Sequence, residues 1–222
     1  MIKIFIIIVL LFIPLSLVYL NIIHPEVDGK FLFSFFVIGV MVERLWETFF
    51  TSKEKDVHKY QGDWTLPVTV FTFFLTSLLL IFEFYNITKK NIFFVVIGLF
   101  LFLFAGIIRF WSIKVLGEHW SIHLVDKSNS TKLTLVRNGP YKYVRHPIYL
   151  GAILELLGIA LIANAFYYLF LIFFVNTPLY ILRSNYEEKI NLKKFGKEYS
   201  VYKREVPSML PLKIFNYFKK QR

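Results

Sequence analysis

Long apolar runs, separated by short polar segments, set the pattern of the whole chain. A helix needs about 20 apolar residues to cross a bilayer, with a range of about 17–25. Four runs have this length, at residues 2–22, 31–50, 65–85 and 91–111, and each predicts one membrane-spanning helix. The first is expected to remain as a span, because no small-residue cleavage pattern follows it.

A fifth apolar block, residues 148–182, is too long for one span and too short for two comfortable ones. Asn164 lies near its middle and predicts a tight hairpin of two helices, 148–163 and 166–188, the second extending into water. Pro178 is expected to kink that second helix, because proline removes one backbone donor. The chain is therefore predicted to be an all-α integral membrane protein with about six transmembrane helices.

The distribution of positive charge predicts the orientation of these helices. With the N-terminus inside, 21 of the 26 Lys and Arg residues fall in cytoplasmic segments and three fall in outside loops. Cytoplasmic loops of membrane proteins carry the excess of Lys and Arg, so both termini are expected to be cytoplasmic. The same loops account for the net charge of +11 without a nucleic-acid partner.

The composition supports the membrane assignment and excludes some chemistries. Hydrophobic residues make up 56% of the chain, against about 45–50% in soluble domains. The chain has no Cys, which excludes disulfides, thiolate metal sites and Cys nucleophiles. His119 and His123 have a spacing that can bind a metal, but an interfacial amphipathic helix is favoured there, with Trp111 and Trp120 at headgroup level. No metal is expected.

The most informative stretch, residues 137–151, lies between two predicted spans and contains the sequence Arg-His-Pro at 145–147. Pro147 suits the first turn of a helix, and the N-terminus of a helix favours an anion such as a carboxylate. The Gly-Pro step at 139–140 predicts a turn that lets the backbone approach a ligand closely. An isolated Arg-His-Pro would more often only hold a helix at the lipid headgroups, but here it belongs to a longer pattern.

An acidic pair, Glu187 and Glu188, follows in the extension of the last predicted helix. Arg183 and Glu187 are four residues apart, so they share a helix face and could form a simple surface pair. In the functional interpretation, one carboxylate binds a cationic or hydroxyl-rich part of a cofactor. Arg183 then holds an anionic substrate by a forked pair of hydrogen bonds. The sequence alone allows both interpretations.

Several polar side chains fall inside the predicted spans, where ionisable groups are costly and are functional candidates by default. They are Glu43, Arg44, Glu47, Glu83, Arg109, Glu155, Asn164 and Asn176. Glu155 lies deeper than most, and either faces the pocket or pairs with Arg109. Several of the others lie near span ends, where they can simply reach the interface.

The combined motifs resemble the isoprenylcysteine carboxyl methyltransferase family, including its prokaryotic members. They are Gly-Pro-Tyr-x-Tyr-x-Arg-His-Pro-x-Tyr-x-Gly, the Glu-Glu pair, Phe-Gly-x-x-Tyr-x-x-Tyr and a Val-Pro step. The resemblance covers roughly residues 100–211 and divides the chain into N-terminal transmembrane helices, 1–90, and a methyltransferase core, 91–222. Glu205 stands before Val-Pro, where eukaryotic members commonly have a basic residue.

The resemblance implies a multi-pass enzyme of a prokaryotic cell membrane that binds S-adenosylmethionine at the cytosolic face. The pocket would be formed by the last helical hairpin and the C-terminal segment. The residues implied for cofactor binding are Gly139, Pro140, Tyr141, Arg145, His146, Pro147, Tyr149, Glu187 and Glu188. The catalytic residues implied are Arg183, Glu187 and His146.

The expected substrate is a lipophilic or lipidated molecule that enters laterally from the bilayer, since its apolar chain would otherwise have to cross water. A carboxylate acceptor would need only orientation by Arg183, and a hydroxyl acceptor would need His146 or a carboxylate of the acidic pair as a base. A phospholipid N-methyltransferase shares a related layout. An NADPH-dependent sterol-type reductase tends to have Pro-Asn-Tyr-x-Gly-Glu, whereas residues 147–152 read Pro-Ile-Tyr-Leu-Gly-Ala. A non-enzymatic scaffold is disfavoured by the complete set of motifs.

Overall fold

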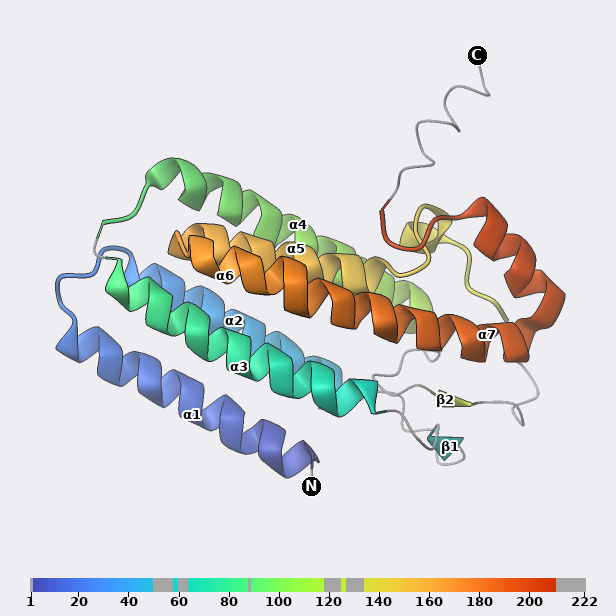
Figure 1. The fold of residues 1–222 in the computed structure, drawn as a ribbon, viewed down its shortest axis with the longest axis horizontal. Helices are drawn as coiled ribbons and strands as arrows, with labels where there is room; N and C mark the ends of the chain where they lie inside the picture. The colour runs from blue at the N-terminus through green and yellow to red at the C-terminus, as the bar shows by residue number, and fades with distance from the viewer. Residues whose placement is uncertain are drawn as a thin grey trace, which may run out of the picture.

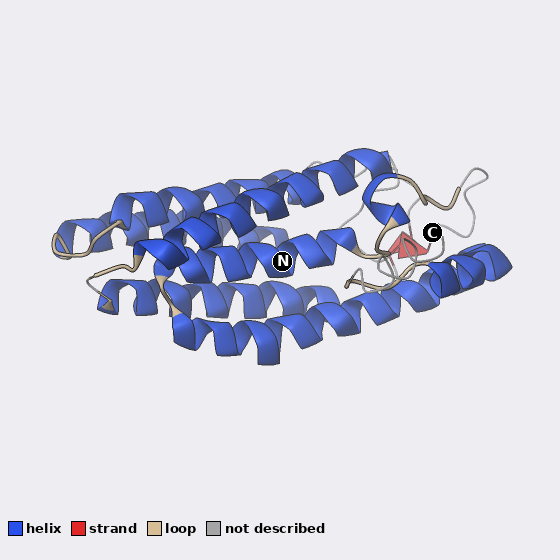
Figure 2. Cartoon of the chain, turned by 90° about the horizontal axis from the view of Figure 1, so that it is seen from above, coloured by secondary structure: helices blue, strands red, loops and turns tan. Residues whose placement is uncertain are grey.

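The computed structural model describes residues 2–49, 58–59, 64–87, 89–117, 125–126 and 134–210, with side chains over 12–43, 64–65, 67–87, 89–117 and 134–210. The helices are α1 (Ile2–Ile23), α2 (Lys30–Phe49), α3 (Thr65–Asn86), α4 (Ile92–Leu116), α5 (Pro147–Ala163), α6 (Phe166–Leu171) and α7 (Thr177–Glu205). Their axes lie roughly along one common direction, apart from the last part of α7, which turns away (Figure 1). A two-residue antiparallel pair, β1 (His58–Lys59) with β2 (Val125–Asp126), lies at one end of the bundle (Figure 2).

The predicted all-α architecture is confirmed apart from these two short strands. A helix forms at each of the six predicted segments, and α4 continues to Leu116, past its predicted end at residue 111. Among the described residues, three helical stretches are long and apolar enough to cross a membrane: Pro67–Asn86, Ile92–Leu116 and Phe166–Glu205. Many large apolar side chains on them are exposed, as suits helices that face lipid rather than water.

The hairpin between α5 and α6 turns at Asn164, as predicted. Asn164 has a left-handed backbone with φ of +56°, a conformation that asparagine tolerates better than most residues. Its Oδ1 accepts a hydrogen bond from the backbone N–H of Asn91 at 2.7 Å. The carboxylate of Glu83 accepts from the N–H groups of Tyr167 and Tyr168 at 3.0 and 2.9 Å. Glu83 therefore caps the start of α6, where a negative charge is favourable.

The helix after this hairpin is continuous through a π-helical turn, η3 (Ile172–Asn176), which ends two residues before Pro178. A π turn rearranges the backbone hydrogen bonds where proline cannot donate one. The sequence predicts a kink at Pro178, and the structure has this π turn shortly before it. The apolar part of the helix ends at Leu182, and a charged extension begins at the next residue. A sharper change of direction lies at Gly196, whose φ is +52°.

The site-bearing helix α5 packs closely against α4 through glycines. A Cβ on Gly98 would lie 2.6 Å from the carbonyl oxygen of Gly158 and 2.7 Å from the backbone N of Ile162. A Cβ on Gly158 would lie 2.8 Å from the backbone N of Phe102. Small residues let two helix backbones approach in this way inside a bilayer.

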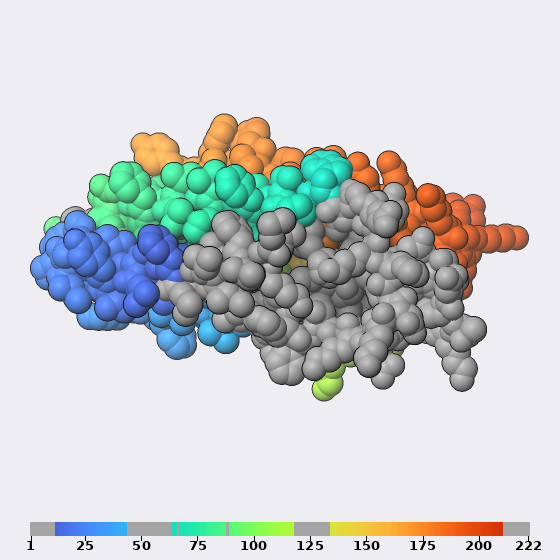
Figure 3. Space-filling view, turned by 90° about the horizontal axis from the view of Figure 1, so that it is seen from below, coloured from blue at the N-terminus to red at the C-terminus, as the bar shows by residue number. Residues whose placement is uncertain are grey.

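The other helices pack around this pair. α3 lies between α1 and the α6–α7 helix (Figure 3). In the core between α2 and α3, the rings of Phe33 and Phe84 stack with their centroids 3.8 Å apart. The start of α3, the start of α5 and the charged part of α7 all point to the end of the bundle that carries the strands (Figure 1).

Candidate functional site

The loop that leads into α5 is fixed against α4. It contains a 3-10 turn, η2 (Gly139–Lys142), which Gly139 begins with φ of +57°. A Cβ on Gly139 would lie 2.8 Å from Cγ2 of Val115 and 3.3 Å from Nε1 of Trp111. Glycine at this position therefore lets the loop lie close to side chains of α4, and the predicted approach of this backbone to a ligand stays a prediction. Two residues later, the backbone carbonyl of Tyr141 accepts a hydrogen bond from the Tyr202 hydroxyl at 2.7 Å.

The start of α5 is joined to the C-terminal segment. The backbone N–H groups of Arg145 and His146 donate to the carbonyl oxygens of Pro207 and Ser208, each at 2.9 Å. Pro147 then begins the helix, as predicted, and is buried. The segment after α7 thus runs alongside the Arg-His-Pro step and closes one side of it.

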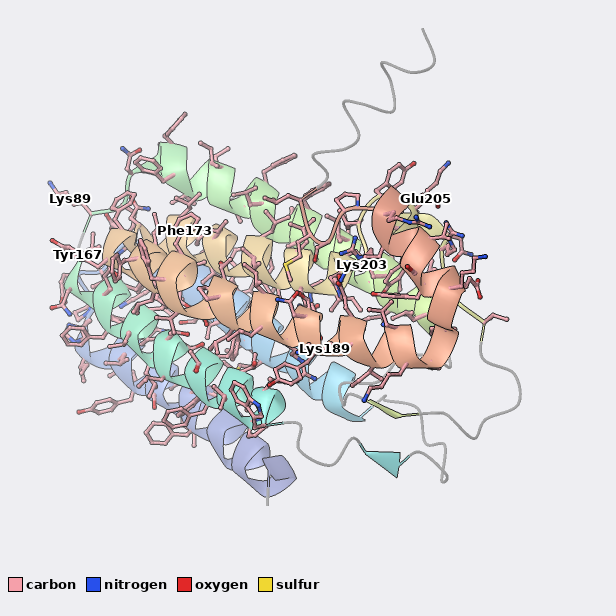
Figure 4. The ribbon with its side chains drawn as sticks, turned by 45° about the vertical axis from the view of Figure 1, so that its right-hand side comes forward. Lys89, Tyr167, Phe173, Lys189, Lys203 and Glu205 are labelled. Atoms are coloured by element: carbon pink, nitrogen blue, oxygen red, sulfur yellow. The ribbon has the colours of Figure 1, made fainter. Side chains whose placement is uncertain are left out.

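The side chain of Arg145 brings the acidic pair to the same place. Its Nε and Nη2 donate to Oε1 of Glu188 at 2.9 and 2.5 Å. The same oxygen lies 3.2 Å from Nε2 of His146, and Oε2 lies 2.6 Å from Nζ of Lys203. The Glu188 side chain is only 4% exposed. A buried carboxylate is stable when it is paired and hydrogen-bonded in this way. Lys203 lies on the last turns of α7 (Figure 4).

His146 lies between the two carboxylates of the pair. Its Nδ1 is 3.4 Å from Oε2 of Glu187, whose side chain is 38% exposed. Burial alone would lower the pKa of His146, but the hydrogen bonds and negative charges of Glu187 and Glu188 outweigh burial and raise the pKa above its usual 6.5. The arrangement therefore favours an imidazolium that carries a proton on each ring nitrogen.

An aromatic wall borders the same site. The rings of His146 and Tyr149 stack with centroids 5.7 Å apart, and Tyr149 lies 5.8 Å from Tyr180 of α7. The Tyr141 hydroxyl is buried and has no hydrogen-bond partner in the described part of the chain. Burial raises the pKa of Tyr141, and the nearby Glu187 carboxylate raises it further. A buried hydroxyl without a partner is rare, and this one lies close to the more exposed carboxylate of the pair.

Arg183 is held from a different helix. Its Nη1 donates to the Thr65 hydroxyl, at the start of α3, at 2.9 Å. Arg183 is 5% exposed, so the interpretation of Arg183 and Glu187 as a simple surface pair is wrong for the arginine. Beside this contact, Nε1 of Trp64 donates to the Tyr186 hydroxyl at 3.4 Å.

Three of the intramembrane polar residues, Glu43, Arg109 and Glu155, lie next to one another. Arg109 is 1% exposed. Its Nε donates to Glu43 at 2.9 Å and lies 3.8 Å from Oε2 of Glu155. Glu155 therefore pairs with Arg109, which was one of its two predicted roles, and Arg109 does not reach the interface. A Cβ on Gly151 would lie 2.4 Å from Cγ of Arg109, so glycine makes room for the arginine.

Some predictions concern residues outside the described part of the chain. These are the side chains of Arg44 and Glu47, and the interfacial helix with His119, Trp120 and His123. Within the described residues, no group of three or more His, Asp or Glu side chains could hold a metal ion.

The predicted site residues belong to η2, the residues between η2 and α5, the start of α5 and the charged part of α7, and these segments lie at one end of the bundle (Figure 1). Sequence reasoning missed Lys203 and Thr65. Lys203 is separated from Glu188 by the break at Gly196, so helix periodicity does not relate the two. Thr65 is a polar residue at the start of a span, and its position alone suggests capping rather than contact with an arginine.

Residues 96–193 match the model of the isoprenylcysteine carboxyl methyltransferase (ICMT) family. The family resemblance is confirmed for this segment. A protein-S-isoprenylcysteine O-methyltransferase from Schizosaccharomyces pombe is 34% identical over 96 residues, which are 43% of this chain and 40% of that protein. The uncharacterized protein YpbQ of Bacillus subtilis is 33% identical over 87 residues, which are 39% of this chain and 50% of that protein.

The similarity in fold extends further along the chain than the match in sequence. A solved structure described as the eukaryotic intramembrane Ras methyltransferase ICMT has a TM-score of 0.55 and 20% identity, and the match covers 91% of this chain and 73% of that one. The chain spans about half the length of the curated relatives that it matches, or less. The ICMT-like segment contains Arg145, His146, Arg183 and the acidic pair, while Thr65 and Lys203 lie outside it.

Proposed function

We propose that this chain is a membrane-embedded methyltransferase that uses S-adenosylmethionine and acts on a lipophilic acceptor, with a carboxylate or a hydroxyl as the acceptor group. The observation that carries the proposal is the meeting of Arg145 and His146 with Glu187 and Glu188, within a segment that matches a methyltransferase family. The Arg-His-Pro step and the acidic pair lie far apart in the sequence. If each only packed its own helix, the two would not need to be in contact.

The donor site would be built from Gly139–Tyr141, Arg145–Pro147, Tyr149 and the acidic pair. The unpartnered Tyr141 hydroxyl near the half-exposed Glu187 carboxylate fits a ligand that offers both hydroxyl groups and a positive charge. S-adenosylmethionine has a ribose, an α-ammonium and a sulfonium that supplies the activated methyl group. The chain itself has to bind the donor, orient it towards the acceptor and exclude water from the site.

The acceptor would lie towards Arg183. A carboxylate acceptor is ionised at neutral pH and needs no base, so the guanidinium has only to orient it. A hydroxyl acceptor has to lose a proton. The raised pKa of His146 makes its neutral, proton-accepting form less available, so the half-exposed carboxylate of Glu187 is the candidate base for that step. An apolar tail would enter from the bilayer rather than through water.

The same proposal includes an orientation and a division of the chain. The N-terminal end of α1 and the site lie towards one end of the bundle, and the loops next to Lys89 and Tyr167 lie at the other (Figure 4). With the excess of basic residues on the cytoplasmic side, the site and both termini would face the cytoplasm. Residues 1–90 form the N-terminal helices and 91–222 the methyltransferase core, with Thr65 linking the two.

Calorimetry on the detergent-purified chain tests the proposal. We expect S-adenosylhomocysteine to bind with a Kd on the order of micromolar, and NADPH not to bind. Tyr141→Phe should weaken binding several-fold, because it removes a hydroxyl that would meet the ligand. Tyr143→Phe is the matched control, since Tyr143 is close in sequence but 48% exposed. Binding of NADPH but not of S-adenosylhomocysteine would favour the reductase and overturn the proposal.

A further inference from the structure

The two carboxylates of the acidic pair occupy different environments. The side chain of Glu188 is 4% exposed and that of Glu187 is 38% exposed. Neighbouring residues of a helix point about 100° apart, so the two side chains need not serve the same partner. The difference in exposure raises the question of which one is available to a ligand.

Glu188 is occupied by groups of the chain itself. Oε1 accepts hydrogen bonds from Nε and Nη2 of Arg145 and lies 3.2 Å from Nε2 of His146. Oε2 forms an ion pair with Nζ of Lys203. Three of these contacts are made to Oε1 and one to Oε2, so both oxygens of Glu188 have partners within the chain. Glu187, in contrast, lies 3.4 Å from Nδ1 of His146 and interacts with Tyr149, but its side chain retains exposed surface.

The groups that occupy Glu188 also hold residues 203–208, which we call the C-terminal return. Nη1 of Arg145 donates to the carbonyl oxygens of Lys203, at 3.0 Å, and Val206. The backbone of residues 145–146 pairs with Pro207 and Ser208. The left-handed turn at Gly196 lets α7 reverse towards the loop before α5. One carboxylate thus joins α7, the Arg-His-Pro step and the C-terminal return.

We propose that Glu188 is a positioning residue that, through Arg145 and Lys203, holds the C-terminal return against the site, and that Glu187 is the carboxylate that contacts the methyl donor. This inference rests on the proposed function for the identity of the ligand. It assigns a role to Lys203, which lies outside the ICMT-like segment. The buried ion pair of Arg145 and Glu188 holds the C-terminal return in place. Removing either partner would leave the other as an unpaired buried charge.

Thiol labelling can measure whether the return is held. The chain has no Cys, so Met209→Cys places a single thiol just after the return, at a position that is 7% exposed. In this background we expect Glu188→Gln and Lys203→Met each to raise the labelling rate by roughly tenfold, as follows from the loss of one charge-assisted hydrogen bond. Glu187→Gln is the matched control and should leave the labelling rate within about twofold of the parent. Lys203→Arg keeps the charge and should restore slow labelling.

Calorimetry with S-adenosylhomocysteine separates positioning from contact. Glu187→Gln should weaken binding roughly tenfold without faster labelling. Lys203→Met should weaken binding by the same factor by which it raises the labelling rate. Bound S-adenosylhomocysteine should slow labelling in the parent, because ligand binding and closure of the C-terminal return are linked. Lys203 is exposed, so this variant carries the test even if Glu188→Gln does not fold.

Two results would overturn the inference. One is equal labelling of Lys203→Met and the parent. The other is faster labelling in Glu187→Gln than in Glu188→Gln, which would reverse the two roles. Failure of the parent to bind S-adenosylhomocysteine would instead refute the proposed function, and the labelling rates would still report on the C-terminal return.

Discussion

The close crossing of α4 and α5 gives a prediction with a defined sign. In Gly158→Ala, the new methyl group would meet backbone atoms of α4: N of Phe102 at 2.8 Å, the carbonyl oxygen of Gly98 at 2.9 Å and Cα of Phe102 at 3.0 Å. Ordinary contacts begin at 3.4 Å. Backbone cannot rotate away as a flexible side chain can, so the two helices have to move apart.

The magnitude follows from two opposing terms. Overpacking costs about 1–3 kcal/mol, and replacing Gly by Ala in a helix returns about 0.5–1 kcal/mol. The expected net loss for Gly158→Ala is therefore up to about 2.5 kcal/mol. For a protein of this size, that lowers the midpoint of thermal unfolding by up to about 10 °C.

Gly106 provides a matched control in α4. A Cβ there meets nothing within 4 Å, so Gly106→Ala should raise the midpoint by about 1–4 °C. The measurement is a thermal melt of each variant in the same detergent, at one heating rate. If Gly158→Ala is as stable as Gly106→Ala, the close contact described here is not a constraint and the reasoning fails.

Four further predictions concern the site and the orientation. Arg183→Ala should keep S-adenosylhomocysteine binding and lower turnover roughly tenfold or more. Arg183→Lys should restore turnover only in part, because lysine lacks the planar fork of arginine. Loss of S-adenosylhomocysteine binding in Arg183→Ala would contradict this. Thr65→Val should raise the acceptor KM several-fold while Thr65→Ser stays near the parent, since only Ser keeps the hydroxyl that Arg183 contacts; equal KM values would contradict it. The raised pKa of His146 contributes stability that is fully present below pH 6.5 and is lost as pH rises through the folded-state pKa. The midpoint of thermal unfolding should therefore fall at alkaline pH, and this slope should be absent in His146→Gln. A thiol at Lys197→Cys should react from the cytoplasmic side and one at Lys89→Cys from the outside; the reverse pattern would refute the orientation.

The helices were predictable because each is encoded locally. Apolar runs of membrane-crossing length mark α1 to α4, and Asn164 marks the hairpin because few other residues accept a left-handed backbone. Pro147 marks the start of α5, because the first turn of a helix does not need the backbone N–H that proline lacks. Local patterns of this kind depend on sequence spacing alone, so no knowledge of distant contacts was needed.

The site was predictable only in part, because its contacts join distant positions. The motifs indicated that residues 145–149 and 183–188 belong together, but not which carboxylate would be buried. That depends on Lys203, which reaches Glu188 only because Gly196 redirects the helix. Glu83 was a functional candidate from its place in a span, and its role as a cap for α6 follows from a hairpin geometry that no local pattern contains.

The C-terminal return also orders events during synthesis. Val206 leaves the ribosome 61 positions after Arg145, which corresponds to a delay of about 3–12 s at typical elongation rates. The apolar helices can insert into the membrane during that interval, while the wall beside the Arg-His-Pro step is still missing. A chain that stops before residue 203 would therefore be expected to reach the membrane with its helices in place and its site incomplete. For this protein, correct insertion and a finished site are two separate outcomes of translation.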